Sequence, residues 1–287
     1  MNNNLDINNN YIYTNDSKQI HLNSSNASIF FNNSMKSNVV FFFSNPFTYQ
    51  KDTIIKKFSI VNAQIPVSYY LINDSNNYIT ISINGQPNIT YTFSNGNYNI
   101  NDFIKQWALI VGTQWKLTYN NITNKLCFEF PTVFTFTNTP IFNILGFDKN
   151  VAYYTSYISG SGYKLIPPYI INFGGILNLD IKTTSFNFHN LNSFEKSETN
   201  IIASVPVNAS SNGFILYNNF TNFNFLFKNN QISELNIMIT DENNNFIDFN
   251  NMDWSLTIQL DTVTRIFDNY ETIQDVYENF AYNYLKK

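Results

Sequence analysis

A chain of 287 residues, 44% hydrophobic and only 13% charged, can bury a large core in one elaborate domain or in two. The formal net charge is −4 and Lys and Arg are not clustered, which excludes the electrostatic pattern of nucleic-acid binding. The single Cys127 excludes an intrachain disulfide, and one cysteine with two histidines cannot build a zinc site. No apolar run reaches the ~20 residues that span a bilayer, so we predict no membrane span.

Residues 1–26 are polar and low in complexity, apart from the apolar Tyr11, Ile12 and Tyr13. A segment with so little to bury does not fold by itself. We therefore predict a flexible N-terminal arm over residues 1–26, which either stays disordered or orders against a neighbouring subunit. The first ten residues also lack the basic and apolar regions of a secretion signal. Removal of the arm should leave thermal stability almost unchanged.

Residues 27–73 contain two predicted strands, at 39–47 and 53–67. Both runs are rich in β-branched and aromatic residues, which suit a pleated, half-buried surface. Pro66 stands at the end of the second run, where the lack of a backbone donor is tolerated. These two strands form the first part of a predicted sandwich.

Residues 74–162 have the pattern of an inserted domain. A hairpin turns at Gly85, and Phe103, Trp107 and Ile110 then follow at helical spacing. The aromatic stripe on this helix is typical of a core rather than of a ligand site.

The predicted helix has recognisable start and stop signals. Asn99 or Asn101 can cap its start, and Gly112 suits its end. A second hairpin at 115–130 and a short helical turn at 140–147 complete the segment. We therefore predict a compact β-β-α-β-β module.

Residues 163–265 return to strand patterns and form the second part of the sandwich. The predicted strands are 163–173, 176–188, 200–207, 213–227, 232–241 and 254–261. With the two strands before the insertion they make eight, without crossover helices between them. This pattern predicts a mainly β protein with a single eight-stranded antiparallel jelly-roll sandwich.

Residues 266–287 are predicted to form a C-terminal helix. Glu271 stands near its start and Lys286 and Lys287 at its end, which matches the helix dipole. The apolar residues of one face are Ile273, Val276, Tyr277, Phe280 and Tyr284.

The last two predicted strands alternate strictly, so their buried sides can be predicted. The side chains expected between the sheets are Leu235, Ile237, Ile239, Leu256, Ile258 and Leu260, with Trp254 closing one end of the core. Those expected to face solvent or another subunit are Asn236, Ser255, Thr257 and Gln259. The twelve residues between the strands are long for a hairpin. We therefore expect a bridge between opposite sheets.

That connection contains four acids: Asp241, Glu242, Asp248 and Asp253. Its first positions match the oxygen ligands of a calcium loop. However, Phe246 occupies the position that needs Gly for a sharp turn, and Met252 the position of the bidentate Glu. These mismatches favour a solvated loop over a calcium site, and we predict no metal ligands.

Residues with catalytic potential lack a recognisable arrangement. His21 lies in the polar arm, and His189 lies in a polar loop with Glu195 and Glu198, without a motif that sets their geometry. The "GSGYKL" segment at 160–165 lacks the third Gly and the Lys-Ser/Thr of a phosphate loop. We therefore predict no catalytic or cofactor-binding residue, no cofactor and no enzyme activity.

Several stretches together resemble the penton (minor capsid) proteins of virophages and Polinton-like viruses. "FSIVNAQIPVSYYLI" (58–72) resembles their second strand and its Ile-Pro-x-Ser-Tyr turn. "FSNGNYNINDFIKQW" (93–107) and "FNILGF" (142–147) resemble a strand–Gly–Tyr–helix module and a Leu-Gly-Phe signature. "ISELNIMITDENNNFIDFNNMDWSLTIQL" (232–260) resembles their closing strand pair, and residues 11–32 resemble their polar entry segment.

The resemblance implies a single jelly roll that forms homopentamers at icosahedral five-fold vertices, with the inserted domain facing outward. It implies a virion protein made in the host cytoplasm, which contacts neighbouring major capsid capsomers and has no catalytic residues. The major capsid proteins of these viruses carry two jelly rolls, for which eight core strands are too few.

Two other functions remain open. The chain could be an attachment or fibre-head protein whose inserted domain binds a host receptor or glycan. It could also be a carbohydrate-active enzyme on a β-sandwich. The mass in solution separates the three, since pentamers favour the penton, trimers the fibre head and monomers the enzyme.

Overall fold

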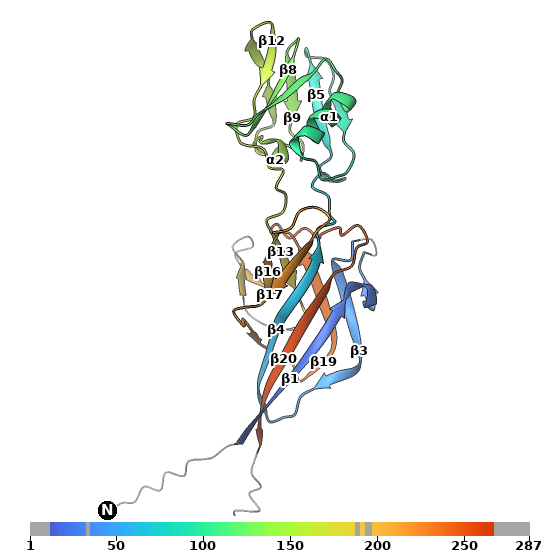
Figure 1. Ribbon diagram of the computed structural model, residues 1–287, viewed down its shortest axis with the longest axis vertical. Coiled ribbons are helices and arrows are strands. Elements are labelled where there is room, and N and C mark those ends of the chain that lie inside the picture. Colours follow the sequence, from blue (N-terminus) through green and yellow to red (C-terminus); the bar gives the residue numbers. More distant parts are fainter. Residues whose placement is uncertain (1–11, 33–34, 187–189, 193–196, 267–287) are drawn as a thin grey trace, which may run out of the picture. The chain divides into compact units, whose positions relative to one another are not determined.

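The computed structural model describes residues 12–32, 35–186, 190–192 and 197–266 (Figure 1). The chain divides into two compact units. The sandwich unit comprises Met1–Val67 and Asn178–Lys287, and the inserted unit comprises Ser68–Leu177. The inserted unit therefore extends beyond the predicted 74–162 at both ends.

The sandwich unit contains two five-stranded antiparallel sheets, here called sheet A and sheet B. Sheet A has the order β1 (Ile12–Asn23), β20 (Ser255–Ile266), β4 (Thr53–Pro66) and β17 (Phe214–Asn218), with β18 (Phe225–Leu226) also paired to β4. Sheet B has the order β16 (Ile201–Pro206), β13 (Asn178–Lys182), β19 (Gln231–Thr240), β3 (Asn38–Thr48) and β2 (Ile29–Phe30). The short helix η1 (Ser24–Asn26) follows β1, and β14 (Asn190–Asn192) pairs with β15 (Ser197–Thr199).

The strand order is consistent with a jelly roll, as predicted. Sheet A places the last strand, β20, between β1 and β4, and sheet B places β19 between β13 and β3. Strands β19 and β20 thus lie in opposite sheets, and residues 241–254 bridge them. The prediction of a bridge in place of a hairpin is confirmed.

The prediction of a flexible arm over residues 1–26 is wrong for the described part. Residues Ile12–Asn23 form β1, which pairs with β20 over its whole length. A sheet edge commonly carries polar side chains, because they prevent pairing with other chains. The polar composition of this segment therefore reflects an edge strand, with Leu22 buried beneath it.

Two predicted strands also need correction. In the 163–173 run only β12 (Gly162–Leu165) is a strand, and it belongs to the inserted unit. Pro167 and Pro168 follow, and prolines cannot donate to a ladder. The 213–227 run is split into β17 and β18 by a loop at 219–224. The sandwich therefore loses the 163–173 strand and gains β1, the short β2 and a second strand from the split run, so the two sheets of its described residues have ten strands in place of eight.

The alternation of β19 and β20 produces the core as predicted. All six side chains expected between the sheets are at most 2% exposed, and Trp254 is 1% exposed. Thr257 was expected to face solvent or another subunit but is buried within the single chain. It lies in mid-sheet between β1 and β4, where its hydroxyl is hydrogen-bonded to His21 Nδ1 at 2.9 Å.

The inserted unit contains two four-stranded sheets and two helices, which is more than the predicted β-β-α-β-β module. One sheet has the order β10 (Tyr153–Thr155), β9 (Phe134–Thr137), β5 (Tyr78–Ile83) and β6 (Ile89–Thr92). The other has the order β11 (Tyr157–Ser159), β12, β8 (Lys125–Phe130) and β7 (Lys116–Asn120). The helices are α1 (Ile100–Ile110) and α2 (Phe142–Leu145).

An aromatic core holds the inserted unit together. Phe103 and Trp107 of α1 are fully buried, as predicted, and Trp107 packs on Phe128 with ring centroids 4.9 Å apart. Asn99 caps α1 through its side-chain oxygen. Gly146 ends α2 in the left-handed conformation, and a β-carbon there would lie 2.5 Å from the backbone oxygen of Tyr169.

The predicted C-terminal helix lies outside the described residues, except for Ile266. So does His189, and the side chains of Glu195 and Glu198 are not described. Among the described helices, none is long and apolar enough to cross a membrane.

Candidate functional site

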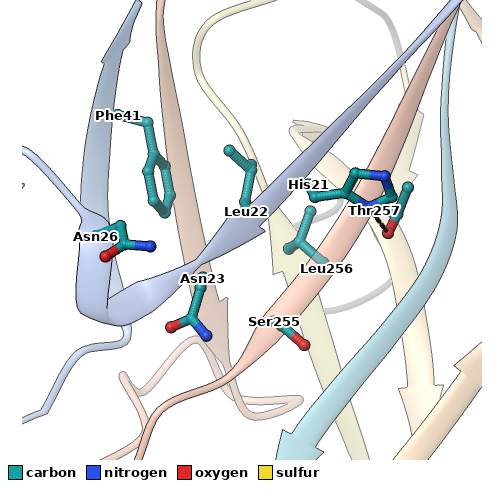
Figure 2. Close-up of a pocket in the computed structure, with 8 residues that line it drawn as sticks. All are labelled: His21, Leu22, Asn23, Asn26, Phe41, Ser255, Leu256 and Thr257. Atoms are coloured by element: carbon teal, nitrogen blue, oxygen red, sulfur yellow. Dashed lines mark hydrogen bonds between the residues drawn. The ribbon is translucent and has the colours of Figure 1, made fainter.

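A groove of about 410 Å³ opens at one side of the sandwich unit, where the ends of β1 and β20 meet β3 (Figure 2). Its apolar lining is formed by Leu22, Phe41 and Leu256, which come from three different strands. Figure 2 shows Phe41 and Leu22 projecting toward the same space, from β3 and β1 respectively. The polar lining residues are His21, Asn23, Asn26, Ser255 and Thr257. These eight side chains carry no carboxylate and no lysine or arginine.

A hydrogen-bonded cluster fixes the chain beside the groove. Lys36 Nζ lies 2.8 Å from Asp253 Oδ1, which also accepts from Ser24 Oγ at 2.8 Å. Trp254 Nε1 donates to the backbone oxygen of Lys36 at 2.8 Å, so the buried indole nitrogen has a hydrogen-bond partner. Burial acts to raise the pKa of Asp253, but the hydrogen bonds from Lys36 and Ser24 outweigh it, and the pKa is lowered.

Two of the four acids of the connection, Asp241 and Asp248, organise its backbone. Asp241 Oδ1 accepts from the amides of Asn243 and Asn245, each at 2.8 Å, and Asp248 Oδ1 accepts from the amide of Asn250 at 2.9 Å. Side-chain oxygens bonded in this way stabilise tight turns. Among the described residues, no group of three His, Cys, Asp or Glu side chains could hold a metal ion.

The connection is not the wholly solvated loop that we predicted. Phe249 is fully buried and Ile247 is 4% exposed. The amide of Phe249 donates to the backbone oxygen of Met35 at 3.2 Å, so the bridge also packs across one end of the sandwich.

The opposite edge of sheet A, along β17 and β18, presents a row of exposed apolar side chains. These are Phe214, Leu216, Phe220, Phe223 and Leu226, with exposed fractions from 44% to 89%. Phe220 is the most exposed, at the tip of the loop that separates the two strands. Sequence reasoning missed this edge because it read 213–227 as one strand. The asparagines at 218, 219 and 222 were the available signal of a turn.

Exposed apolar residues also lie on the groove side of the sandwich. Ile29, Phe31 and Phe42 are 40%, 65% and 52% exposed, on and beside β2 and β3. Figure 1 shows β1 and β3 on one side of the sandwich and β16 and β17 on the other. The sandwich therefore has an apolar surface on each of its two lateral sides.

The groove and β17 lie on the same rows of sheet A, where a row is a set of residues paired across neighbouring strands. One row runs from Asn23 through Ser255 and Gln64 to Leu216, and the next runs from His21 through Thr257 to Asn62 and Asn218. The groove residues thus begin the rows that end at β17 and the Phe220 loop.

The inserted unit carries a charged cluster on β7, β8 and β12. Glu129 pairs with Lys116 at 3.1 Å and with Lys164 at 3.5 Å. The hydrogen bond from Lys116 lowers the pKa of Glu129 despite partial burial. Burial raises the pKa of the nearby Cys127 thiol, which keeps it protonated and makes it a poor nucleophile.

A second groove, of about 280 Å³, lies on the inserted unit beside Gly146. The other residues that line it are Asn143, Phe147, Asp148, Lys149, Asn150, Tyr169 and Ile170. Tyr169 and Ile170 are 56% and 60% exposed, so an apolar face lies beside amide and charged groups.

One lysine of the sandwich points inward. Lys56 on β4 is 8% exposed and donates to the backbone oxygen of Asn229 at 2.9 Å and to Asn230 Oδ1 at 2.7 Å. Its Nζ lies 5.3 Å from the centre of the Tyr49 ring. Burial lowers the pKa of Lys56, and burial, with a contribution from Asp16, raises the pKa of Tyr49 to about 12.

No family model matches this sequence, and no curated protein matches it. Among solved structures, the chain is similar to the crystal structure of the selenomethionine-labelled mavirus penton protein. The two are 12% identical, the TM-score is 0.44, and the alignment covers 88% of this chain and 100% of the other.

Proposed function

We propose that this protein is a viral structural protein, a penton capsomer that forms homopentamers at the five-fold vertices of an icosahedral capsid. The observation that carries the proposal is the pair of apolar surfaces on opposite lateral sides of one jelly-roll sandwich. Two different surfaces that complement each other make a heterologous contact, and repeated heterologous contacts form a closed ring or an open filament.

The position of the two surfaces favours a closed ring over an open filament. A ring involves rotation about an axis without translation along it, so its complementary surfaces lie at the same height. The groove and β17 occupy the same rows of sheet A, through Leu216 and Asn218. With an axis along the strands, each copy meets the next at one level. The remaining surfaces are available to neighbouring major capsid capsomers in the virion.

The mass of the complete chain in solution tests this proposal. Size-exclusion chromatography with light scattering should give about five times the chain mass of 33.4 kDa, with the fraction of pentamer rising with concentration. A monomer over the whole accessible concentration range would refute self-assembly, and a stable trimer would favour a fibre head.

The groove beside Gly146 supports a second candidate, attachment to a host glycan through the inserted unit. Binding sites combine an apolar face with a few polar groups that fix the orientation of the ligand. Tyr169 provides such a face, and Asn143 and Asp148 provide polar groups. A glycan array should then show binding that Tyr169→Ala abolishes. Tyr157→Ala, at a similarly exposed tyrosine (51% against 56%) outside this groove, should leave the binding unchanged.

A further inference from the structure

We infer that the Phe220 loop of one copy seats in the groove between β1, β3 and β20 of a second copy of this chain. This inference rests on the proposed ring assembly and names the contact that holds it. The Phe220 loop comprises residues 219–224, and the groove is the one shown in Figure 2.

The loop is built to present its aromatic ring. Asn219 Oδ1 accepts from the amide of Phe223 and from Thr221 Oγ1, both at 3.1 Å, while Asn219 Nδ2 donates to the Phe223 oxygen at 2.8 Å. The Asn219 amide donates to the Val61 oxygen on β4 at 2.9 Å, which fixes the loop to the sheet. A loop that is already ordered loses little entropy on binding. Phe220 nevertheless stays 89% exposed in the single chain.

The groove has the size and lining to receive an aromatic side chain. Its volume of about 410 Å³ lies within the range of small-molecule pockets. Leu22, Phe41 and Leu256 offer an apolar base, while Asn23 and Asn26 remain exposed at its rim. An aromatic anchor in a pocket with a polar rim is the usual arrangement at the centre of an interface.

Charge does not oppose the contact. Residues 213–227 contain no Asp, Glu, Lys or Arg, and neither do the eight residues that line the groove. The loop and the groove residues therefore bring no carboxylate, lysine or arginine of their own into the contact, and burial of such a group is costly unless a partner compensates for it.

Register places the two partners at the same level. Asn218, the residue before the loop, ends the row that begins at His21, and the neighbouring row begins at Asn23. A ring whose axis runs along the strands therefore brings the loop of each copy to the groove of the next.

The first test is the substitution Phe220→Asp in the complete chain. Phe220 makes no core contact, so the melting temperature should stay unchanged, while self-association measured by analytical ultracentrifugation should weaken at least about tenfold. Ile122→Asp is the matched control, because Ile122 is also an exposed loop residue, at 93%, but lies on the inserted unit. It should associate as the wild type does.

The second test uses a filled groove. Asn26→Trp should block the groove, since Asn26 is an exposed lining residue, and it should leave the chain folded and largely monomeric. In a mixture, the Phe220→Asp copy keeps an intact groove and the Asn26→Trp copy keeps an intact loop. Each pair of unlike copies can therefore make one contact. The mixture should therefore form heterodimers and stop there, which is the signature of a head-to-tail contact.

The outcomes separate this inference from the proposed function. If Phe220→Asp and Asn26→Trp copies still form the wild-type oligomer, the contact is elsewhere and this inference is overturned, while the capsomer proposal stands. If the wild type itself remains monomeric, both are overturned. Loss of assembly in both variants without the heterodimer in the mixture also rejects the loop-in-groove contact.

Discussion

Trp254 illustrates how a single residue closes the core of the sandwich. Its ring is 1% exposed, meets Phe41 edge-on at 6.2 Å and donates a hydrogen bond to Lys36. Trp254→Ala should lower the free energy of unfolding by roughly 3–5 kcal/mol, since a large cavity and an unpaired carbonyl result. Met252→Ala, at a nearby 46% exposed position, should cost under ~0.5 kcal/mol. Urea unfolding of both variants checks the difference, and equal losses would contradict this account of the core.

The ion pair beside the groove predicts a pH dependence. Because the pKa of Asp253 is lowered in the folded state, its contribution to stability is present above the unfolded pKa of ~3.9 and is lost as the pH falls through the folded value. Asp253→Asn should therefore destabilise the protein at pH 7, by under about 1 kcal/mol given solvent screening. The difference from wild type should narrow toward pH 3. In a Lys36→Met background this pH dependence should shrink, and a difference that is constant with pH would argue against the pair.

For single residues, the sequence predicted which face of a strand a side chain points to better than it predicted which residues surround that side chain. Strict alternation placed Leu256 and Ile258 inward, because period two is a property of the strand itself. The burial of Thr257 depends on β1, which lies more than two hundred residues earlier and was not recognised as a strand. Phe220 was missed for a similar reason, because its exposure depends on a loop that interrupts a run with strand composition.

Among the elements, β1 has the clearest experimental consequence. Deletion of residues 1–26 should lower the melting temperature markedly or prevent folding, because β20 loses its pairing with β1 and keeps only β4, and Leu22 leaves the core. Deletion of residues 1–11 alone should leave the melting temperature unchanged. Circular dichroism melts of the two truncations measure this contrast. Equal stability of both truncations and the full chain would restore the flexible-arm interpretation.

The elements that sequence predicted well have local signals, and those it missed do not. Asn99 caps the start of α1 and Gly112 follows its end. The capping residues therefore predicted both ends of the helix within a few residues. The 163–173 run has strand composition, but its two prolines leave only Gly162–Leu165 as a strand. Which unit that short strand joins is decided by its partner β8, and a single sequence does not contain that information.

For the whole molecule, the two units have separate cores and should be separable. Residues 68–177 expressed alone should unfold in one cooperative transition, because the aromatic core around Trp107 lies wholly within them. Trp107→Ala should abolish that transition. Leu109→Ala is the matched control, since Leu109 lies on the same helix at 77% exposure and should be tolerated. An isolated unit without a cooperative transition would show that it depends on the sandwich.

The sequence indicated the jelly roll and the insertion, but not the surfaces proposed for assembly. Most of the sandwich strands and the long bridge between β19 and β20 follow from periodicity and turn residues along the chain. The groove joins Leu22, Phe41 and Leu256, and such a juxtaposition exists only after the sheets have formed.

The most direct test of the central claim is an electron-microscopy reconstruction of the assembled complete chain. The ring proposal predicts five-fold particles in which the β17–β18 edge of each copy meets the β1–β3 side of the next, with Phe220 in the groove. Particles with two-fold symmetry, in which the same surface meets itself, would contradict it.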